Sequence, residues 1–117
     1  MHEFAIAKDI INTIKTNYSE NYNSLIAINI LSGNFSGTVI DSLQFGLETI
    51  LKEEKLENVS IRISEVKAKV VCECGCEYEL NDIFDLCPEC SSYTRDFISG
   101  DGVMIDTIEF NQEEKKI

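Results

Sequence analysis

The chain has 117 residues, 44% of them hydrophobic, and a formal net charge of −11 from 21 acidic and 10 basic residues. This length suits one domain, or one domain with a small inserted module. The negative charge would repel a phosphate backbone, so the balance argues against nucleic-acid binding. No apolar run is long enough to cross a bilayer, and the N-terminus has no export signal. We therefore expect a cytoplasmic protein with no membrane partner.

The first predicted element is an amphipathic helix over about residues 4–18. Apolar residues recur there at the i, i+3, i+4, i+7 spacing of one helix face; they are Ala7, Ile10, Ile11, Ile14 and Tyr18. A polar loop over 17–24 leads to the Ile-rich run 25–31, whose length and β-branching favour a buried strand. The residues at 32–34 then form a turn.

The second half of the body is predicted as a helix followed by strands. Thr38 and Asp41 have the spacing of a capping box, and the helix behind them would run to about residue 55. Its inward residues would be Ile40, Leu43, Leu47, Ile50 and Leu51. The alternation over 59–70 predicts one long half-exposed strand. The residues 103–110 predict a last strand, which we expect to pair antiparallel with that long strand.

All five cysteines lie between Cys72 and Cys90, as C-E-C-G-C, ten residues, then C-P-E-C. Two close pairs on facing turns can enclose one zinc ion tetrahedrally. Gly75 and Pro88 suit such turns. The alternative is a set of buried or disulfide-bonded cysteines, but a reducing cytosol favours a metal.

The residues between the two cysteine turns include several apolar side chains, which we expect to pack beneath the turns: Tyr78, Leu80, Ile83, Phe84 and Leu86. The predicted fold is α+β, with a small mixed α/β body of two helices packed on a three-stranded sheet. A zinc-ribbon-like module over 71–97 is inserted into it. The body would then comprise residues 1–70 and 98–117.

His2 is the only histidine in the chain. The amine of Met1, the imidazole of His2 and the backbone amides of His2 and Glu3 place four nitrogen donors in one short segment. Nitrogen donors in a plane suit Ni²⁺ or Cu²⁺. Taken alone, the signal is weak, because a histidine at this place is ordinarily a solvated residue.

Together these residues resemble the HypA/HybF family of hydrogenase-maturation nickel metallochaperones over nearly the whole chain. The N-terminal Met1-His2-Glu3 is similar to that family's nickel-binding motif. Further similar segments are Ile30-Leu31-Ser32-Gly33, Phe35-Ser36-Gly37, Ser42-Leu43-Gln44-Phe45, Val70 to Tyr78, Cys87-Pro88-Glu89-Cys90 and Gly102 to Phe110. The joint occurrence of the N-terminal motif and a four-cysteine loop is specific.

The resemblance implies two metals and two protein partners. Nickel would be bound transiently by His2, with the Met1 amine and the backbone or side chain of Glu3. A structural zinc would be held by Cys72, Cys74, Cys87 and Cys90. The implied partners are a nickel-linked maturation GTPase and the hydrogenase large subunit, with urease open as a second client. The protein itself would be a monomer or a weak homodimer.

The sequence departs from the family pattern at two places. The first cysteine pair, often C-x-x-C in the family, is compressed here. Gly75 and Tyr78 align Cys74 with the second ligand, so Cys72 takes the first place and Cys76 is spare or an alternative zinc ligand. Asn34 stands where an acidic residue is frequent.

Two other functional classes compete with the nickel metallochaperone. One is a non-catalytic zinc-ribbon module for protein interaction, in which His2 is incidental. The other is an enzyme. We do not expect catalysis, because the sequence offers no second histidine, no paired nucleophile and base, and no glycine-rich phosphate loop.

Overall fold

The computed structural model describes residues 2–111 and divides the chain into two compact units. The α/β unit comprises the described parts of Met1–Leu31, Thr38–Ser64 and Met104–Ile117. The cysteine unit comprises Ser32–Gly37 and Glu65–Val103. The sequence predicts a separable module over residues 71–97, and these boundaries stay a prediction.

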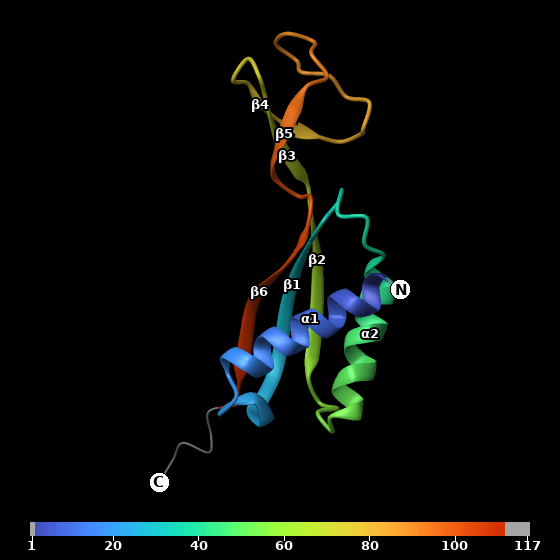
Figure 1. Cartoon of the computed structure of the whole chain (residues 1–117), viewed down its shortest axis with the longest axis vertical. Helices are drawn as coiled ribbons and strands as arrows, with labels where there is room; N and C mark the ends of the chain where they lie inside the picture. Colours follow the sequence, from blue (N-terminus) through green and yellow to red (C-terminus); the bar gives the residue numbers. More distant parts are fainter. Residues whose placement is uncertain (1, 112–117) are drawn as a thin grey trace. The chain divides into compact units, whose positions relative to one another are not determined.

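Two helices and a three-stranded sheet build the α/β unit. In chain order its elements are α1 (His2–Asn17), the short 3₁₀ turn η1 (Tyr22–Ser24), β1 (Leu25–Gly33), α2 (Ile40–Glu53), β2 (Ser60–Val66) and β6 (Val103–Phe110). The strand order is β2-β1-β6, and Figure 1 shows both helices on one face of this sheet. The predicted α+β class with two helices on a three-stranded sheet is confirmed.

The apolar stripe predicted for the first helix forms the centre of the α/β core. The buried residues of α1 are Ala7, Ile10, Ile11 and Ile14. They meet a second stripe on α2, whose buried residues are Leu43, Gly46, Leu47, Ile50 and Leu51. Gly46 permits a close approach of the helices, because a Cβ there would lie 3.3 Å from the Cβ of Ala7. The helix period alone therefore identified most of this core.

Tyr18 was predicted to lie on the buried face of the first helix, and this is wrong. Tyr18 follows the last residue of α1 and is exposed, with its ring 5.4 Å from that of Phe110. Tyr22 is buried instead, from the loop predicted to be polar, and its hydroxyl donates a hydrogen bond to Glu54. The path of the chain between the end of α1 and η1 therefore places Tyr22, and not Tyr18, in the core.

α2 begins without the predicted capping box. Its N-cap residue is Val39, whose side chain has no acceptor atom, and no side-chain cap bond is formed there. The backbone N–H of Val39 instead donates to the carboxylate of Glu3 at 3.1 Å. A carboxylate near a helix N-terminus is favoured by the helix dipole, so an acid from α1 takes over the role expected of Thr38 and Asp41.

The long strand predicted over 59–70 is two strands in different sheets, β2 and β3 (Ala68–Cys72). Asn34 occupies the break. Its backbone N–H donates to the carbonyl of Val66 and its Oδ1 accepts from the N–H of Ala68, each at 2.9 Å. The side-chain bond replaces a strand partner at the point where the chain changes sheet.

The last strand was predicted to pair with that long strand, and this is also wrong. β6 neighbours β1, which lies in the middle of the sheet. The physical reason is visible in the sequence, because the run of β1 is nearly all apolar and suits a central position, whereas β2 and β6 alternate and suit edges.

The cysteine unit holds a second sheet of order β4-β3-β5, with β4 at Glu77–Leu80 and β5 at Arg95–Ser99. β3 and β4 are antiparallel, with Val70 opposite Tyr78. The core of this sheet contains Ala68, Val70 and Leu80. Gly100, at φ +88°, passes so close that a Cβ there would lie 2.3 Å from the Cα of Ala68.

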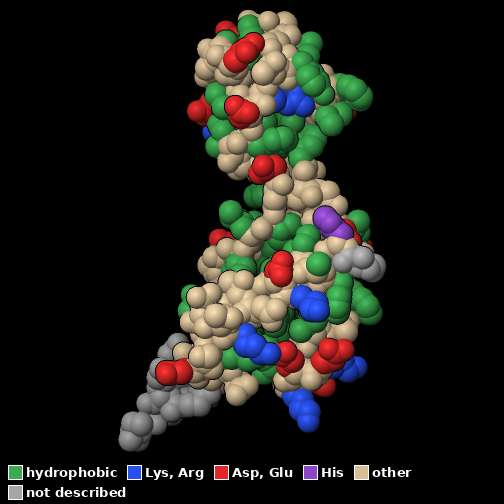
Figure 2. Space-filling model, in the orientation of Figure 1, with side chains coloured by type: hydrophobic (Ala, Val, Ile, Leu, Met, Phe, Trp, Pro, Cys, Tyr) green, Lys and Arg blue, Asp and Glu red, His purple; other side chains and the backbone are tan. Residues whose placement is uncertain are grey.

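The prediction that five apolar residues pack beneath the cysteine turns is correct only in part. Leu80 is buried and Tyr78 packs against the core of the cysteine unit. Ile83, Phe84 and Leu86 are exposed, and Figure 2 shows hydrophobic side chains gathered on one flank of this unit. Within the part of the chain that the structure describes, neither helix is long and apolar enough to cross a membrane.

Candidate metal centres

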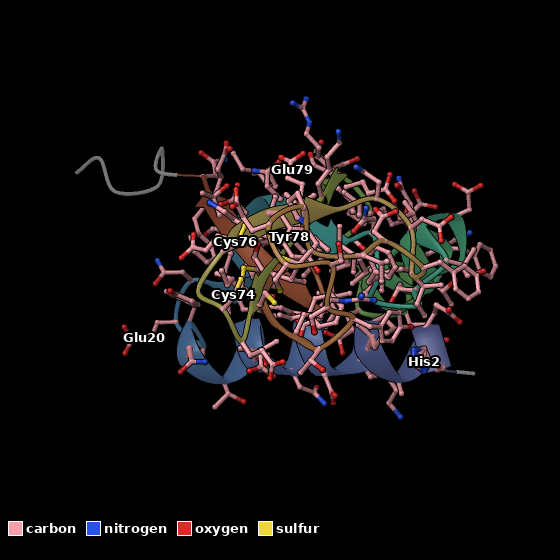
Figure 3. All side chains as sticks on the ribbon, turned by 90° about the horizontal axis from the view of Figure 1, so that it is seen from above. His2, Glu20, Cys74, Cys76, Tyr78 and Glu79 are labelled. Carbon is pink, nitrogen blue, oxygen red and sulfur yellow. The ribbon has the colours of Figure 1, made fainter. Side chains whose placement is uncertain are left out.

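The first candidate centre lies at the start of α1. His2 is exposed in the first helical turn (Figure 3). The first N–H groups of an α-helix have no acceptor within the helix. The amide nitrogens of His2 and Glu3 can therefore lose their protons without breaking the helix ladder. Met1, whose amine the sequence proposes as a ligand, lies outside the described residues.

Glu3 has a structural contact that its sequence position did not reveal. Its carboxylate accepts the N–H of Val39. This bond, followed by one from the N–H of Glu3 itself, holds the pKa of the Glu3 carboxyl below its usual value. The side chain of Glu3 therefore joins the starts of α1 and α2.

An apolar groove of about 550 Å³ lies beside Glu3, between the first turns of the two helices. Phe4 and Phe45 form its apolar part, and the side chain of Phe45 is 71% exposed. The sequence analysis places Phe45 only in a segment similar to a helix of the resembled family. Its position on the outer face of α2, away from the buried stripe, is the sequence signal that could have predicted its exposure.

The second candidate centre is built on two backbone turns. In the first, which follows β3, the N–H of Gly75 donates to the carbonyl of Cys72 at 2.8 Å and the N–H of Cys72 donates to that of Cys76 at 2.9 Å. Gly75 has φ +93°, which glycine adopts without steric cost. This geometry turns the chain within one C-x-C-G-C segment.

The second turn spans Cys87 to Ser92. The N–H of Ser91 donates to the carbonyl of Cys87 at 2.8 Å, and the N–H of Cys87 donates to that of Ser92 at 3.0 Å. The N–H of Glu89 also points at the sulfur of Cys87, at 3.4 Å. Pro88 restricts φ at the residue after Cys87. Backbone N–H groups directed at a sulfur favour its thiolate form.

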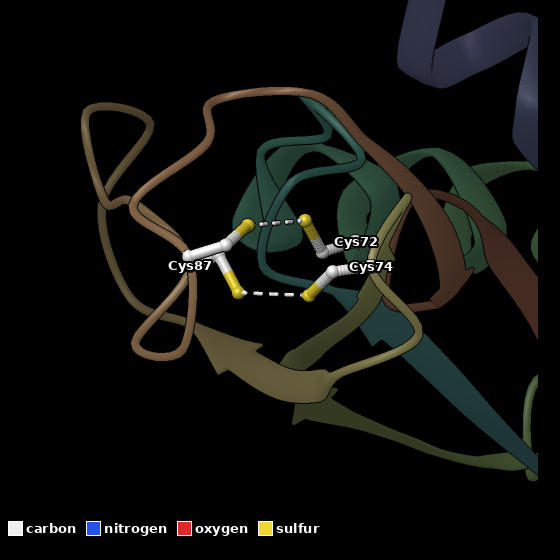
Figure 4. A group of neighbouring side chains, drawn as sticks. Cys72, Cys74 and Cys87 are labelled. Atoms are coloured by element: carbon white, nitrogen blue, oxygen red, sulfur yellow. Dashed lines mark hydrogen bonds between the residues drawn. The ribbon is translucent and has the colours of Figure 1, made fainter.

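The two turns bring together the sulfurs of Cys72, Cys74, Cys87 and Cys90, all within 4.8 Å of one another. The separations are 3.4 Å between Cys72 and Cys90 and 3.7 Å between Cys74 and Cys87 (Figure 4). Four thiolates about 2.3 Å from a tetrahedral zinc would lie about 3.8 Å apart, whereas a disulfide bond is about 2.05 Å long. The donor set and spacing therefore fit a tetrahedral metal ion and not disulfides.

The thiols of Cys87 and Cys90 differ in how readily they ionise. Burial opposes ionisation of Cys87, but hydrogen bonds from the N–H groups of Cys90 and Glu89 outweigh it and lower the pKa of Cys87 to about 6. The N–H of Ser92 lowers the pKa of Cys90, but the thiols of Cys72 and Cys74 outweigh it and raise that pKa to about 12. Neighbouring thiolates repel one another, so a full set requires a cation, and metal binding must release protons.

Cys76 lies on the first turn with Cys74 (Figure 3) but outside the group of four sulfurs. It is half-buried, and its sulfur is 3.7 Å from the carbonyl of Glu77. Burial and then the neighbouring Cys87 raise the pKa of Cys76 to about 11.

A family model described as "Hydrogenase/urease nickel incorporation, metallochaperone, hypA" matches residues 1–110. The hydrogenase maturation factor HypA of Francisella philomiragia is 30% identical over 112 residues, which cover 95% of this chain and 100% of the relative. The factor of the same name from Geobacter metallireducens is 27% identical over 110 residues, covering 93% and 98%.

Two solved structures share the fold. The solution structure of the Ni metallochaperone HypA from Helicobacter pylori matches with a TM-score of 0.72 at 16% identity, covering 92% of this chain and 96% of that one. A solution structure of a HypA protein matches with a TM-score of 0.71 at 18% identity, covering 95% and 97%. Both are similar to this chain along nearly their whole length.

Proposed function

The chain belongs to the HypA family of nickel metallochaperones for hydrogenase maturation, and from this premise we propose that it captures Ni²⁺ at its N-terminus and assists nickel insertion into [NiFe]-hydrogenase. The observation that carries the proposal is the position of His2. The only histidine of the sequence is exposed in the first turn of α1, where backbone N–H groups have no helical acceptors.

The proposed nickel ligands are the imidazole and backbone amide of His2, the amine of Met1 and the backbone nitrogen of Glu3. Nitrogen donors in a plane are a preferred environment for Ni²⁺. The ligands come from a few consecutive residues at a chain end, so the ion can be taken up and passed on.

The helix dipole provides a physical reason for ligation by backbone amides. The start of an α-helix carries about half a positive charge, which disfavours a bound cation. Two deprotonated amides cancel the charge of Ni²⁺, so the resulting centre is nearly neutral. Coordination by His2 and Met1 alone would leave the full dication at the positive end of α1.

The second metal in the proposal is a resident zinc ion held by Cys72, Cys74, Cys87 and Cys90, with Cys76 spare. A closed tetrathiolate site is structural and has no open position for substrate. Zinc binding in small modules has an apparent free energy of about 10–16 kcal/mol. This ion stabilises the cysteine unit and is not the cargo.

We propose a non-catalytic role with two protein partners, a nickel-linked maturation GTPase and the hydrogenase large subunit. Urease is a further candidate client, because handling nickel for it requires the same ligand chemistry. The competing function, a zinc-ribbon interaction module in which His2 is incidental, predicts zinc without nickel uptake.

Nickel titration by calorimetry tests the proposal, at about pH 6 and about pH 8 on untagged protein. Amide nitrogens bind only after losing protons, so affinity must fall at the lower pH. Equal affinity at both values would contradict amide ligation. A variant extended by a few residues before Met1 loses the amine ligand and should bind more weakly. Unchanged binding by that variant would favour the interaction module.

A further inference from the structure

The loop between β4 and Cys87 presents large apolar side chains to solvent. The exposed fractions are 53% for Ile83, 78% for Phe84 and 52% for Leu86, and the nearby Tyr93 is also exposed. Contiguous exposed apolar side chains on a globular protein ordinarily mark an interaction site. We call these four residues the apolar tip.

The polar side chains of this loop bond to its own backbone. The carboxylate of Asp85 accepts the N–H groups of Asn81 and Asp82, at 2.9 and 3.0 Å. The carboxylate of Asp82 accepts the N–H of Phe84 at 2.9 Å. The backbone is thus fixed by acids that lie at the loop's start and end, while the apolar side chains point outward.

Arg95 of β5 holds the same loop from the other side. Its guanidinium donates to the carbonyl of Asp85 at 3.0 Å and to that of Ile83 at 2.9 Å. The guanidinium also lies 4.6 Å from the ring centroid of Tyr93. One side chain therefore fixes the loop backbone and keeps Tyr93 beside it.

This arrangement preorganises the apolar tip for binding. The loop is anchored at one end by the buried Leu80 and at the other by Cys87, in the four-sulfur cluster. Because these bonds already restrict its backbone, the loop loses less conformational entropy on binding a partner than a mobile loop would. Aromatic residues in such a position are the usual hot spots of an interface.

The charge of the cysteine unit restricts what the tip can bind. Its acidic residues are Glu65, Glu73, Glu77, Glu79, Asp82, Asp85, Glu89, Asp96 and Asp101, and its basic residues are Lys67, Lys69 and Arg95. The two lysines pair with acids at 3.9 and 3.8 Å, and Arg95 is engaged by the loop. A tetrathiolate zinc would add further negative charge. A second copy of the unit, or an anionic membrane, would be repelled.

We propose that the apolar tip inserts Phe84 into an apolar pocket rimmed by lysine or arginine on the hydrogenase large-subunit precursor. The choice of the large-subunit precursor as the partner rests on the proposed function. The apolar pocket is inferred from the exposed side chains of the apolar tip, and its basic rim from charge complementarity with the acidic cysteine unit.

The test measures binding of the purified large-subunit precursor to full-length wild type, Phe84→Ser, Phe84→Leu and Met104→Ser. Phe84 and Met104 are both largely exposed, in the cysteine unit and on β6 of the α/β unit respectively. Phe84→Ser should raise Kd at least about tenfold, and Phe84→Leu and Met104→Ser by less than about threefold. Zinc and nickel contents should be unchanged in all four proteins. The wild-type affinity should also fall as salt is added.

Three outcomes would overturn the proposal: precursor binding unaffected by Phe84→Ser, loss of binding to the maturation GTPase in place of the precursor, or self-association of wild type that Phe84→Ser abolishes. Failure of the nickel function is distinguishable from these. It would appear as absence of nickel uptake by wild type while Phe84→Ser still weakens precursor binding. His2→Ala should leave the precursor affinity at the wild-type value.

Discussion

The carboxylate of Glu3 accepts the backbone N–H of Val39 at 3.1 Å, so the first turn of α1 is tied to the residue that starts α2. The bond satisfies one of the N–H groups that a helix start leaves without a partner. It also separates two contributions of Glu3 under the proposed function. The side chain joins the helix ends, and the backbone nitrogen is the proposed nickel ligand.

This separation predicts different effects for two substitutions of Glu3. Glu3→Gln keeps an oxygen acceptor for Val39 and keeps the backbone amide, so the nickel Kd should change by less than about threefold. Glu3→Pro is compatible with a first helical turn but has no amide proton to lose, so its Kd should rise at least about tenfold. Calorimetry measures both values, and circular dichroism checks that helix content is kept. Nickel binding by Glu3→Pro at wild-type affinity would exclude the amide ligand.

A second matched pair distinguishes the zinc ligands. Cys74→Ser removes one of the four clustered sulfurs, whereas Cys76→Ser removes the neighbouring sulfur outside the cluster. We predict that Cys76→Ser retains about one zinc per chain and that Cys74→Ser loses most of it at limiting chelator. Metal analysis after dialysis against a chelator provides the comparison. Equal zinc loss from both variants would show that Cys76 is a ligand.

The periodicity of apolar residues correctly predicted those helices and strands whose structure depends mainly on their own local sequence. The last strand was predicted at 103–110 and is observed at Val103–Phe110. The stripes of the two helices were also identified, because helix packing repeats every 3.6 residues. Register and pairing were harder. The change of sheet after Val66 depends on Asn34, far away in the sequence, and no local pattern records that contact.

Close backbone packing in the cysteine unit leads to a third prediction. A Cβ on Gly33 would lie 2.1 Å from the carbonyl oxygen of Gly100, whereas one on Gly102 would have no neighbour within 4 Å. Gly33→Ala should lower the free energy of unfolding by about 3 kcal/mol or more, since backbone atoms must move. Gly102→Ala should change it by less than about 1 kcal/mol. Denaturant titration measures both, and similar values would contradict the observed contact.

A fourth prediction concerns pH and the buried Tyr22. The carboxylate of Glu54 accepts from Lys15 at 2.8 Å and from the Tyr22 hydroxyl, and these two bonds, with Lys15 first, lower the pKa of Glu54. A carboxyl group with a lowered pKa stabilises the fold at neutral pH. That contribution disappears as pH falls through the lowered pKa.

Glu54→Gln should therefore be less stable than wild type by about 1 kcal/mol near neutral pH, a value reduced by the exposure of Lys15. The difference should shrink towards zero as pH falls through the lowered pKa of Glu54. Thermal unfolding of both proteins, in the same metal state at each pH, measures it. A difference that grows on acidification would have the opposite sign to the one expected here.

The candidate metal centres were predictable to different degrees. Cysteine spacing predicted a four-sulfur cluster on two short turns, and the family resemblance assigned Cys72 and Cys74 to it in place of Cys76. The contact of Glu3 with Val39 was not predictable, since it joins residues from two helices. Phe84 was misplaced for a related reason. An apolar residue is ordinarily assigned to the core, and only the bonds of Asp82, Asp85 and Arg95 reveal that the loop turns it outward.

The most direct test of the two-metal account is the metal content of wild type and His2→Ala after incubation with Ni²⁺ and removal of unbound ions. The account predicts about one zinc per chain in both proteins, and about one nickel in wild type alone. Equal nickel in His2→Ala, or a wild type that keeps zinc and takes up no nickel, would contradict it.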